Sequence, residues 1–314
     1  MPGTPDVAHA VRPLDEAYRA YVHAHAEATL WHDADFLAAL VPPGERGAWL
    51  YVAAERDGEL VAVWPHYVKR RLDGRVVTVP PLARYADPLG GDAAFAKTGL
   101  AALTQGRAAV TLLLSPGQQL AGEHLPARTH LRERTTYLAS TAGGVAGMRT
   151  RVSKRMRRTL RKAGDHWTVA EVERLGTREL RILAEPFRRQ GIAQPYADEV
   201  VARVAALLQP RGQLVAQVLL DPAGEAQAVG VALLDARRGY MWLNGSTDAA
   251  RTHHGGTYVY WTNFLACAAR GVPVIDCLGS ELAGPAENRR QLGARPVGYL
   301  QVEGRYSWLA RLRK

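Results

Sequence analysis

Residues 239–298 read GYMWLNGSTDAARTHHGGTYVYWTNFLACAARGVPVIDCLGSELAGPAENRRQLGARPVG. The order of apolar and polar runs predicts a strand, a polar glycine-rich loop, a helix from Thr257, a second strand, and then a further loop, helix and strand. The helix ends at Gly271, because glycine suits a helix C-terminus. Its core-facing side chains are expected to be Tyr260, Trp261, Phe264 and Leu265.

The loop GSTDAARTHHGG at 245–256 leads directly into this helix. Backbone N–H groups in the first turn of a helix have no intrahelical acceptor, and the helix dipole gives that end a partial positive charge. Together with Arg251 they predict an anion-binding site. We expect the phosphates of a substrate to be bound here by Gly245, Ser246, Arg251, Gly255, Gly256 and Thr257.

The second strand of this segment, VPVIDCLGS at 272–280, is apolar except for Asp276. The aspartate should lie near the carboxyl end of the strand, where α/β layouts usually bind ligands. A carboxylate among apolar neighbours needs a partner. Two interpretations therefore stay open: a structural hydrogen bond to backbone, and a role in binding or converting a substrate.

A second informative stretch is RTRVSKRMRRTLRKAG near the middle of the chain, in which eight basic residues and no acidic one fall between Arg149 and Lys162. Helical spacing places Val152, Met156 and Leu160 on one narrow apolar stripe. Because like charges at i,i+4 repel, the pattern favours an acidic partner: a phosphate-bearing ligand, a nucleic acid or an acidic carrier protein. A solvated helix that links two halves is the alternative. The expected donor contacts are Arg151, Lys154, Arg155 and Arg158.

The length of 314 residues predicts two domains, which we expect at 1–147 and 148–314. An apolar run, an Asp- and Gly-containing turn and a second apolar run occur in both halves, with VAV at 61–63 and VGV at 229–231. The repeated pattern predicts a tandem duplication of one α+β unit, an α/β-sandwich-like arrangement of a mixed, mostly antiparallel sheet flanked by helices. Chance similarity of two hairpins is the competing explanation.

Net charge, cysteine placement and the distribution of apolar residues limit the kinds of partner, metal site and location that the sequence predicts. The net charge is +10, from 40 basic and 30 acidic residues. A positive net charge favours binding of acidic partners but does not indicate which kind of acidic partner is bound. Cys267 and Cys277 lie in apolar runs without CxxC or His spacing, so we expect buried free thiols and no metal site. No signal pattern and no apolar stretch of membrane-spanning length occurs, which predicts a cytoplasmic protein.

Taken together, these segments resemble the FemABX-like branch of the GNAT acyltransferase superfamily. The matching features are the basic segment RMRRTLRKAG at 155–164, then Phe187, Arg189 and Gly191, and the series Tyr240, Gly245, Arg251, Gly255, Ala269, Gly271, Asp276, Gly279, Glu287, Arg290 and Gly293. Two departures stand out. Asn288-Arg289 replaces a Phe-Lys pair that peptidyltransferases of the branch often have. The run from Arg251 to Gly256 is one residue longer than the usual coenzyme A loop.

The resemblance implies two tandem GNAT-like domains and an enzyme that transfers an acyl or aminoacyl group to a small-molecule amine. The donor would be aminoacyl-tRNA, acyl-coenzyme A or an acyl carrier protein, with no tightly bound cofactor. Such a reaction needs the donor carbonyl and the acceptor nitrogen about 3–3.5 Å apart, a stabilised oxyanion and the removal of a proton.

The candidate catalytic residues are His66, Asp276 and Arg289. His66 and Asp276 are candidate bases, and Arg289 or the backbone N–H groups around Asn244-Gly245 are candidate oxyanion donors. Other possible bases are Tyr85, Asp87 and His254. We expect the amine in a cleft between the two domains, in contact with Trp64, Tyr85, Asp87 and Tyr260. The alternative function is a non-catalytic RNA-binding protein that uses the basic helix, although such proteins usually interleave exposed aromatic residues for base stacking.

Overall fold

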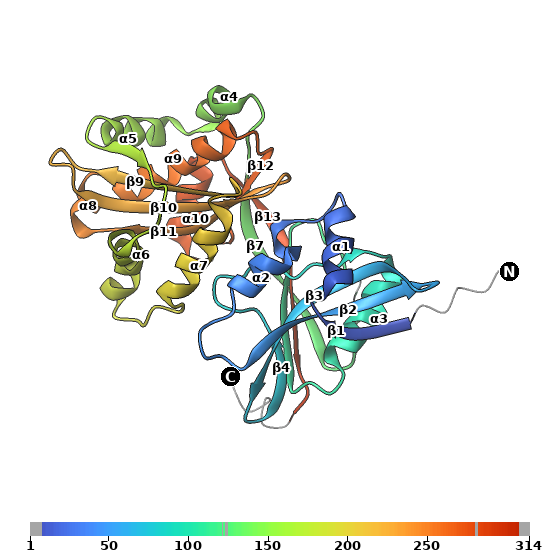
Figure 1. The fold of residues 1–314 in the computed structure, drawn as a ribbon. Coiled ribbons are helices and arrows are strands. Elements are labelled where there is room, and N and C mark those ends of the chain that lie inside the picture. Colours follow the sequence, from blue (N-terminus) through green and yellow to red (C-terminus); the bar gives the residue numbers. More distant parts are fainter. Residues whose placement is uncertain (1–7, 121, 123–124, 280–281, 308–314) are drawn as a thin grey trace. The chain divides into compact units, whose positions relative to one another are not determined.

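The computed structural model describes residues 8–120, 122, 125–279 and 282–307. The chain divides into two compact units (Figure 1): unit 1 comprises Met1–Arg134 with Gly298–Lys314, and unit 2 comprises Thr135–Val297. It passes from unit 1 to unit 2 within strand β7 (Thr129–Ser140) and returns within β13 (Arg295–Arg305). These bounds differ from the predicted division at 147/148, because the last strand pairs with β6 of unit 1.

Unit 1 is a mixed sheet with the strand order β1-β2-β3-β4-β6-β13, in which only β4 and β6 run parallel. The turn between β2 and β3 has Asp57 and Gly58 at φ 53° and 82°, the left-handed pair that a tight hairpin needs. The elements of unit 1 are β1 (Ala8–Pro13), α1 (Glu16–Ala24), the 3-10 helix η1 (Leu30–His32), α2 (Ala34–Ala39), β2 (Gly47–Arg56), β3 (Glu59–Arg71), β4 (Gly74–Thr78), β5 (Leu89–Gly90), α3 (Ala93–Thr104) and β6 (Ala109–Leu114).

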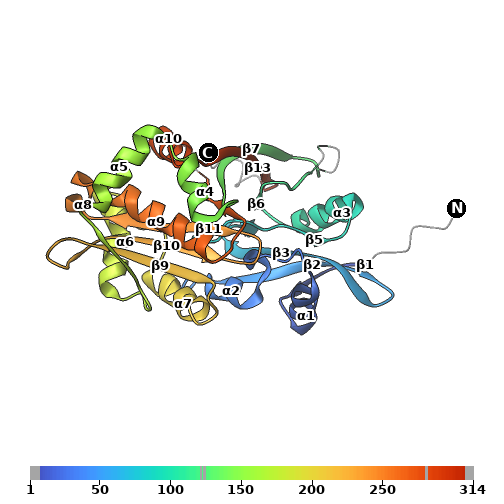
Figure 2. The same ribbon diagram turned by 90° about the horizontal axis from the view of Figure 1, so that it is seen from above.

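Unit 2 repeats this plan with the strand order β7-β12-β11-β10-β9-β8, and again one pair, β11 and β12, runs parallel. Helices α4, α5 and α9 lie on one face of its sheet and α6 and α7 on the other, as Figure 1 shows edge-on; Figure 2 gives the view from above. The elements of unit 2 are α4 (Gly144–Arg151), α5 (Lys154–Gly164), β8 (Thr168–Glu171), α6 (Thr177–Gln190), α7 (Asp198–Leu208), β9 (Leu214–Leu220), β10 (Ala226–Leu234), β11 (Gly239–Ser246), α8 (Asp248–Thr252), α9 (Gly255–Ala269), β12 (Val274–Asp276) and α10 (Ala283–Gln291).

Both halves of the chain therefore have the same order: three antiparallel strands, a helix, and a strand parallel to the third. The last strand of each half changes unit, since β7 pairs with β12 and β13 pairs with β6. The predicted architecture is confirmed: an α+β unit with a mixed, mostly antiparallel sheet flanked by helices occurs twice in tandem. Among the described residues no helix is both long and apolar enough to cross a bilayer.

The basic stretch forms two helices rather than one. Val152 is extended, and Ser153 caps α5 by accepting a hydrogen bond from the N–H of Met156 at 3.1 Å. Serine favours such a cap over a helix interior, which breaks the helix between α4 and α5. The predicted apolar stripe is confirmed, because Val152, Met156 and Leu160 are buried in the core that contains α9.

Candidate active site

The site lies where two parallel strands of unit 2 separate. β11 and β12 pair only at Gly239 with Ile275 and at Tyr240 with Asp276. Beyond Tyr240, β11 continues to Ser246 with β10 as its partner on one side. Beyond Tyr240 none of the described strands pairs with the other edge of β11. We refer to the opening between β11 and the end of β12 as the wedge.

A cavity of about 650 Å³ occupies the wedge. Six of the predicted site residues line it: Ser246, Arg251, Gly256, Thr257, Tyr260 and Arg289. Asn244 and His254, two lesser candidates from the sequence, line it too. The remaining lining residues were not predicted as site residues: Arg189 of α6, and Gly284, Pro285 and Asn288 of α10. The positions of α6 and α10 in the fold bring these residues to the cavity.

The N-terminus of α9 opens into the wedge. His254 precedes the helix in the left-handed conformation with φ 57°, and no side chain caps the helix. A Cβ atom on Gly255 would lie 2.8 Å from the Cβ of Ala250, so this close approach of α8 and α9 requires glycine. The first turn of α9 has no acidic residue, and its dipole is therefore free to attract an anion.

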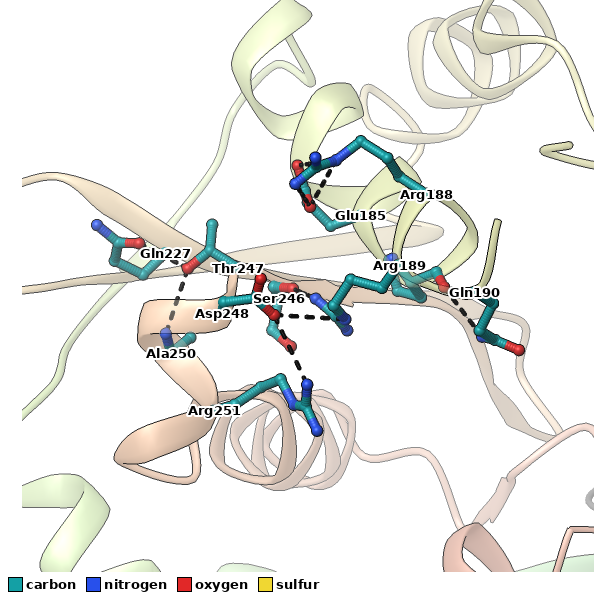
Figure 3. Close-up of polar contacts among 11 residues, drawn as sticks. Glu185, Arg188, Arg189, Gln190, Gln227, Ser246, Thr247, Asp248, Ala250 and Arg251 are labelled. Carbon is teal, nitrogen blue, oxygen red and sulfur yellow. Dashed lines mark hydrogen bonds and ion pairs between the residues drawn. The ribbon is translucent and has the colours of Figure 1, made fainter. Parts of the chain in front are cut away.

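Two arginines flank this helix end (Figure 3). Arg189 reaches from α6 to the backbone carbonyl of Ser246, to which it donates a hydrogen bond, and its Nε lies 3.7 Å from Asp248 Oδ1. Arg251 approaches the same carboxylate, with Nη1 3.6 Å from Oδ1. Asp248 and Arg251 are both more than 60% exposed, so water screens this contact strongly and the ion pairs are weak. The mouth of the wedge keeps a net positive charge.

Tyr260, one turn further along α9, and Arg289 of α10 line the same cavity. Arg289 Nε lies 3.4 Å from the Tyr260 hydroxyl, and Arg289 also donates to the backbone carbonyl of Gly279. Burial raises the pKa of the Tyr260 phenol well above its usual value, so the hydroxyl stays protonated at neutral pH. Burial likewise raises the pKa of Cys277, which lies next to Tyr260, to about 12. This part of the cavity therefore offers a phenolic proton and a fixed cation.

Asp276 is not in the cavity. It is completely buried, accepts a hydrogen bond from Thr136 Oγ1 at 2.6 Å and another from the N–H of Leu278 at 2.8 Å. Thr136 Oγ1 in turn accepts a hydrogen bond from Gly279 N–H. The carboxylate thus fixes the chain that follows β12, and the structural interpretation replaces the catalytic one. Gly245 is also outside the wedge, because a Cβ there would meet the backbone of Ile182 in α6.

Four predicted residues, His66, Trp64, Tyr85 and Asp87, lie in unit 1, at the place that corresponds to the wedge. β4 and β6 separate after Val77 and Val110 in the same manner as β11 and β12.

In unit 1, however, the chain after β4 fills the gap. The N–H of Ala86 donates to Leu113 of β6 at 2.8 Å, and Trp64 Nε1 of β3 donates to the carbonyl of Ala86 at 2.7 Å. Asp87 accepts a hydrogen bond from Ser115 N–H at 2.7 Å.

This loop explains why the predicted acceptor site and the base His66 are not supported. Trp64, Tyr85, Asp87 and His66 are all at most 3% exposed and serve to close the gap in unit 1. Helix α3 follows, and the Asp92 carboxylate caps its N-terminus. The corresponding helix of unit 2, α9, has no side-chain cap. Unit 1 therefore has the same pair of separating parallel strands as unit 2, but its own buried side chains occupy the space between them.

The burial of His66 has a consequence for stability. Burial lowers the pKa of His66 from 6.5 to about 4, so the unfolded chain binds a proton between these values that the folded chain does not. Stability therefore falls as the pH drops from 6.5 towards 4, by up to roughly 3 kcal/mol from this residue. We expect His66→Gln to lose less stability than the wild type between pH 7 and pH 4.5 in urea unfolding. The exposed control His23→Gln should follow the wild type, whereas parallel curves for His66→Gln and the wild type would contradict the assignment.

The basic residues of α5 lie on the surface of unit 2. Lys154, Arg155 and Arg158 are exposed, as predicted. Arg151, at the end of α4, donates to the carbonyls of Ser140 and Ala142 and so holds α4 to the end of β7. Within the described residues none of the eight basic side chains from 149 to 162 forms an ion pair.

The cysteines agree with the sequence prediction, since Cys267 and Cys277 are both buried and free. No group of three histidine, cysteine or acidic side chains that could hold a metal ion occurs in the described ranges.

Comparison with known proteins identifies the fold. The family model of the acetyltransferase (GNAT) domain matches residues 147–287, which include α5, the wedge and most of α10. The match covers less than half of the chain, so this part of unit 2 is similar to an acetyltransferase (GNAT) domain. The fold that the resemblance to the FemABX-like branch implied is confirmed by solved structures of similar fold.

Three solved structures share the fold over nearly the whole chain. FemX superposes with a TM-score of 0.63 at 14% identity, covering 93% of this chain and 96% of its own. L-PGS from Bacillus licheniformis gives 0.54 at 13%, with 96% and 98% covered. A tandem GNAT protein from the clavulanic acid biosynthesis pathway gives 0.52 at 9%, with 95% and 98% covered. No curated protein sequence matches the chain.

Proposed function

We propose that the protein is an N-acyltransferase that takes an acyl or aminoacyl group from a phosphate-bearing donor and transfers it to a small-molecule amine. The donor is aminoacyl-tRNA, acyl-coenzyme A or an acylated carrier protein, and it enters the wedge of unit 2. The wedge carries this proposal: the end of β11, the uncapped start of α9 and three arginines line one cavity. Because these donors are made in the cytoplasm, we expect the protein to act there.

Each part of the wedge has a role in acyl transfer. The phosphates of the donor bind at the start of α9 and Arg251, where backbone N–H groups and a guanidinium favour negative charge. The donor carbonyl lies along the edge of β11 that borders the wedge, whose N–H groups stabilise the oxyanion that forms when the amine attacks. The carbon–nitrogen bond forms as the bond from the carbonyl carbon to the oxygen or sulfur of the carrier breaks.

Two protons move in this reaction. Tyr260 donates its phenolic proton to the departing oxygen or sulfur, and Arg289 stabilises the phenolate that results. The attacking amine releases a proton to His254, which lines the cavity and carries an imidazole, the side chain that most often acts as a general base. The two residues replace His66 and Asp276 in the roles of acid and base.

The exposed face of α5 binds the carrier. Six basic side chains of α5, which form no ion pair within the described residues, repel one another, and a polyanion would relieve that repulsion. A non-catalytic RNA-binding protein would use the same face. It would, however, have no need of the wedge, and this favours the transferase.

A donor panel tests the proposal directly. The purified protein is incubated with a mixture of amines and, in parallel, with labelled acetyl-coenzyme A, charged tRNA and acylated carrier protein. We expect label to appear in an amide with one class of donor and to depend on Tyr260. RNA binding without transfer from any of the three donors would favour the RNA-binding function instead.

A charge-reversed variant tests the role of α5. We expect Arg155→Glu with Arg158→Glu to raise the KM for a tRNA or carrier-protein donor at least about tenfold and to make it less sensitive to salt, because phosphate or carboxylate contacts are lost. The control is Lys97→Glu with Arg237→Glu, an equal change of charge at exposed positions outside α5. An unchanged KM for every donor would show that α5 does not bind the carrier.

A further inference from the structure

A second cavity lies beside α9 and is separate from the wedge. It has a volume of about 450 Å³ and lies between α4–α5 and α9, and none of its lining residues lines the wedge. We refer to it as the α5–α9 groove. Successive residues of α9 divide between the two cavities: Tyr260 lines the wedge, and Tyr258 and Trp261 line the groove. The size is that of a site for one small ligand.

The floor of the groove is aromatic. Trp261 is only 5% exposed and Tyr258 is half-buried, so a ligand placed here would contact their rings without needing them to move. Gly164, the last residue of α5, allows the close approach of that helix to Tyr258: a Cβ at this position would lie 3.0 Å from the phenolic oxygen.

The rim of the groove is strongly basic. Arg149, Arg157 and Arg161 line it from α4 and α5, and none of them has an ion pair within the described residues. Arg157 is held in place by a hydrogen bond to the carbonyl of Val152 at 2.8 Å. One carboxylate, Asp165, lies at the C-terminal end of α5 and also lines the groove. Burial raises the pKa of Tyr258. The positive charge of Arg149 lowers this pKa and the negative charge of Asp165 raises it, so both charged groups lie close enough to act on the phenol.

From this arrangement we infer that the α5–α9 groove binds a nucleotide. The base stacks on Tyr258, the phosphate is held by Arg149, Arg157 and Arg161, and Asp165 accepts a hydrogen bond from an amino group of the base. A phospholipid fits less well, since its acyl chain would bury the Asp165 carboxylate against methylene groups without a donor. Inorganic phosphate would leave the aromatic floor uncovered. The site goes beyond the proposed transferase activity and does not depend on it.

The nucleotide could be free or part of an RNA, and titration calorimetry with the full chain separates these sources. The ligands are AMP, inorganic phosphate, octyl phosphate and the oligonucleotide rA6. We expect AMP to bind at least about tenfold more tightly than phosphate or octyl phosphate. Tighter binding of rA6 than of AMP identifies RNA as the source, and equal or weaker binding identifies a free nucleotide.

Variants locate the site. We expect Arg161→Ala to weaken AMP binding about tenfold and Arg237→Ala, which removes an exposed arginine between β10 and β11 outside the groove, to change it less than about twofold. Tyr258→Leu should weaken AMP binding and leave phosphate binding unchanged.

Arg251→Glu separates this site from the wedge: AMP in the groove is unaffected, whereas AMP bound in the wedge is lost. The inference is overturned by equal losses in Arg161→Ala and Arg237→Ala, by octyl phosphate binding as tightly as AMP, or by loss of AMP binding in Arg251→Glu alone.

Discussion

Replacing Tyr260 with phenylalanine should lower kcat by about 10²- to 10⁴-fold and change KM for the donor little. The ring remains in the core between α9 and α10, and only the hydroxyl is removed. Because burial keeps this phenol protonated, it is the proton donor that the wedge offers to the leaving group. General-acid catalysis by a positioned side chain is worth about this factor. Single-turnover measurements with the donor identified by the panel would isolate the chemical step.

The chain offers a matched control in the same unit. Tyr137 accepts a hydrogen bond from Arg290 at 3.2 Å with the guanidinium 5.6 Å from its ring, much as Arg289 lies 3.4 Å from the Tyr260 hydroxyl and 6.0 Å from that ring. Tyr137→Phe therefore removes a similar buried hydroxyl outside the wedge and should keep the wild-type kcat. Equal losses in the two variants would mean that Tyr260 acts through stability, and an unchanged kcat in Tyr260→Phe would remove it from the mechanism.

Reversing the charge of Arg251 should raise the KM for the donor by roughly 10- to 100-fold, with a much smaller effect on kcat. A hydrogen bond from a guanidinium to a phosphate is worth about 1.5–3 kcal/mol, and a carboxylate in its place adds repulsion. The new carboxylate of Arg251→Glu would also lie near Asp248, which now approaches Arg251 to 3.6 Å. Initial rates at several donor concentrations give the two constants.

Arg237→Glu is the appropriate control for Arg251→Glu. It makes the same change in net charge at an exposed residue of the turn between β10 and β11, on the opposite end of β11 from the wedge. Its KM should stay within about twofold of the wild type, because solvent and salt screen a distant surface charge. A similar rise of KM in both variants would show that the donor responds to overall charge and not to a site at α9.

Local sequence signals predicted the parts of the site that are continuous in the chain. The loop 245–256 and the start of α9 could be assigned because Arg251, Gly255 and Gly256 precede an apolar helix directly. Arg189 and Asn288 reach the same cavity from α6 and α10. No spacing in the sequence connects them to the loop, since tertiary packing alone brings these helices to the end of β11.

The two halves differ in a way that their shared pattern conceals. The hairpins at 61–63 and 229–231 predicted the duplication correctly, and similarity of pattern suggested that both halves contribute to catalysis. The loop PPLARYADPLGG at 80–91, before α3, has the proline and glycine content typical of a surface loop. Its burial depends on pairing of Ala86 with Leu113, a long-range contact that no local signal encodes. The exchange of β7 and β13 between the units is hidden for the same reason.

The central claim is that the acyl donor binds in the wedge of unit 2. The most direct test is a crystal structure with an unreactive analogue of the donor that the panel selects. We predict a phosphate at hydrogen-bond distance from the backbone N–H groups of Gly255 and Gly256, and the acyl carbonyl between the edge of β11 that borders the wedge and Tyr260. An analogue bound elsewhere at full occupancy, with the wedge holding only solvent, would contradict this account.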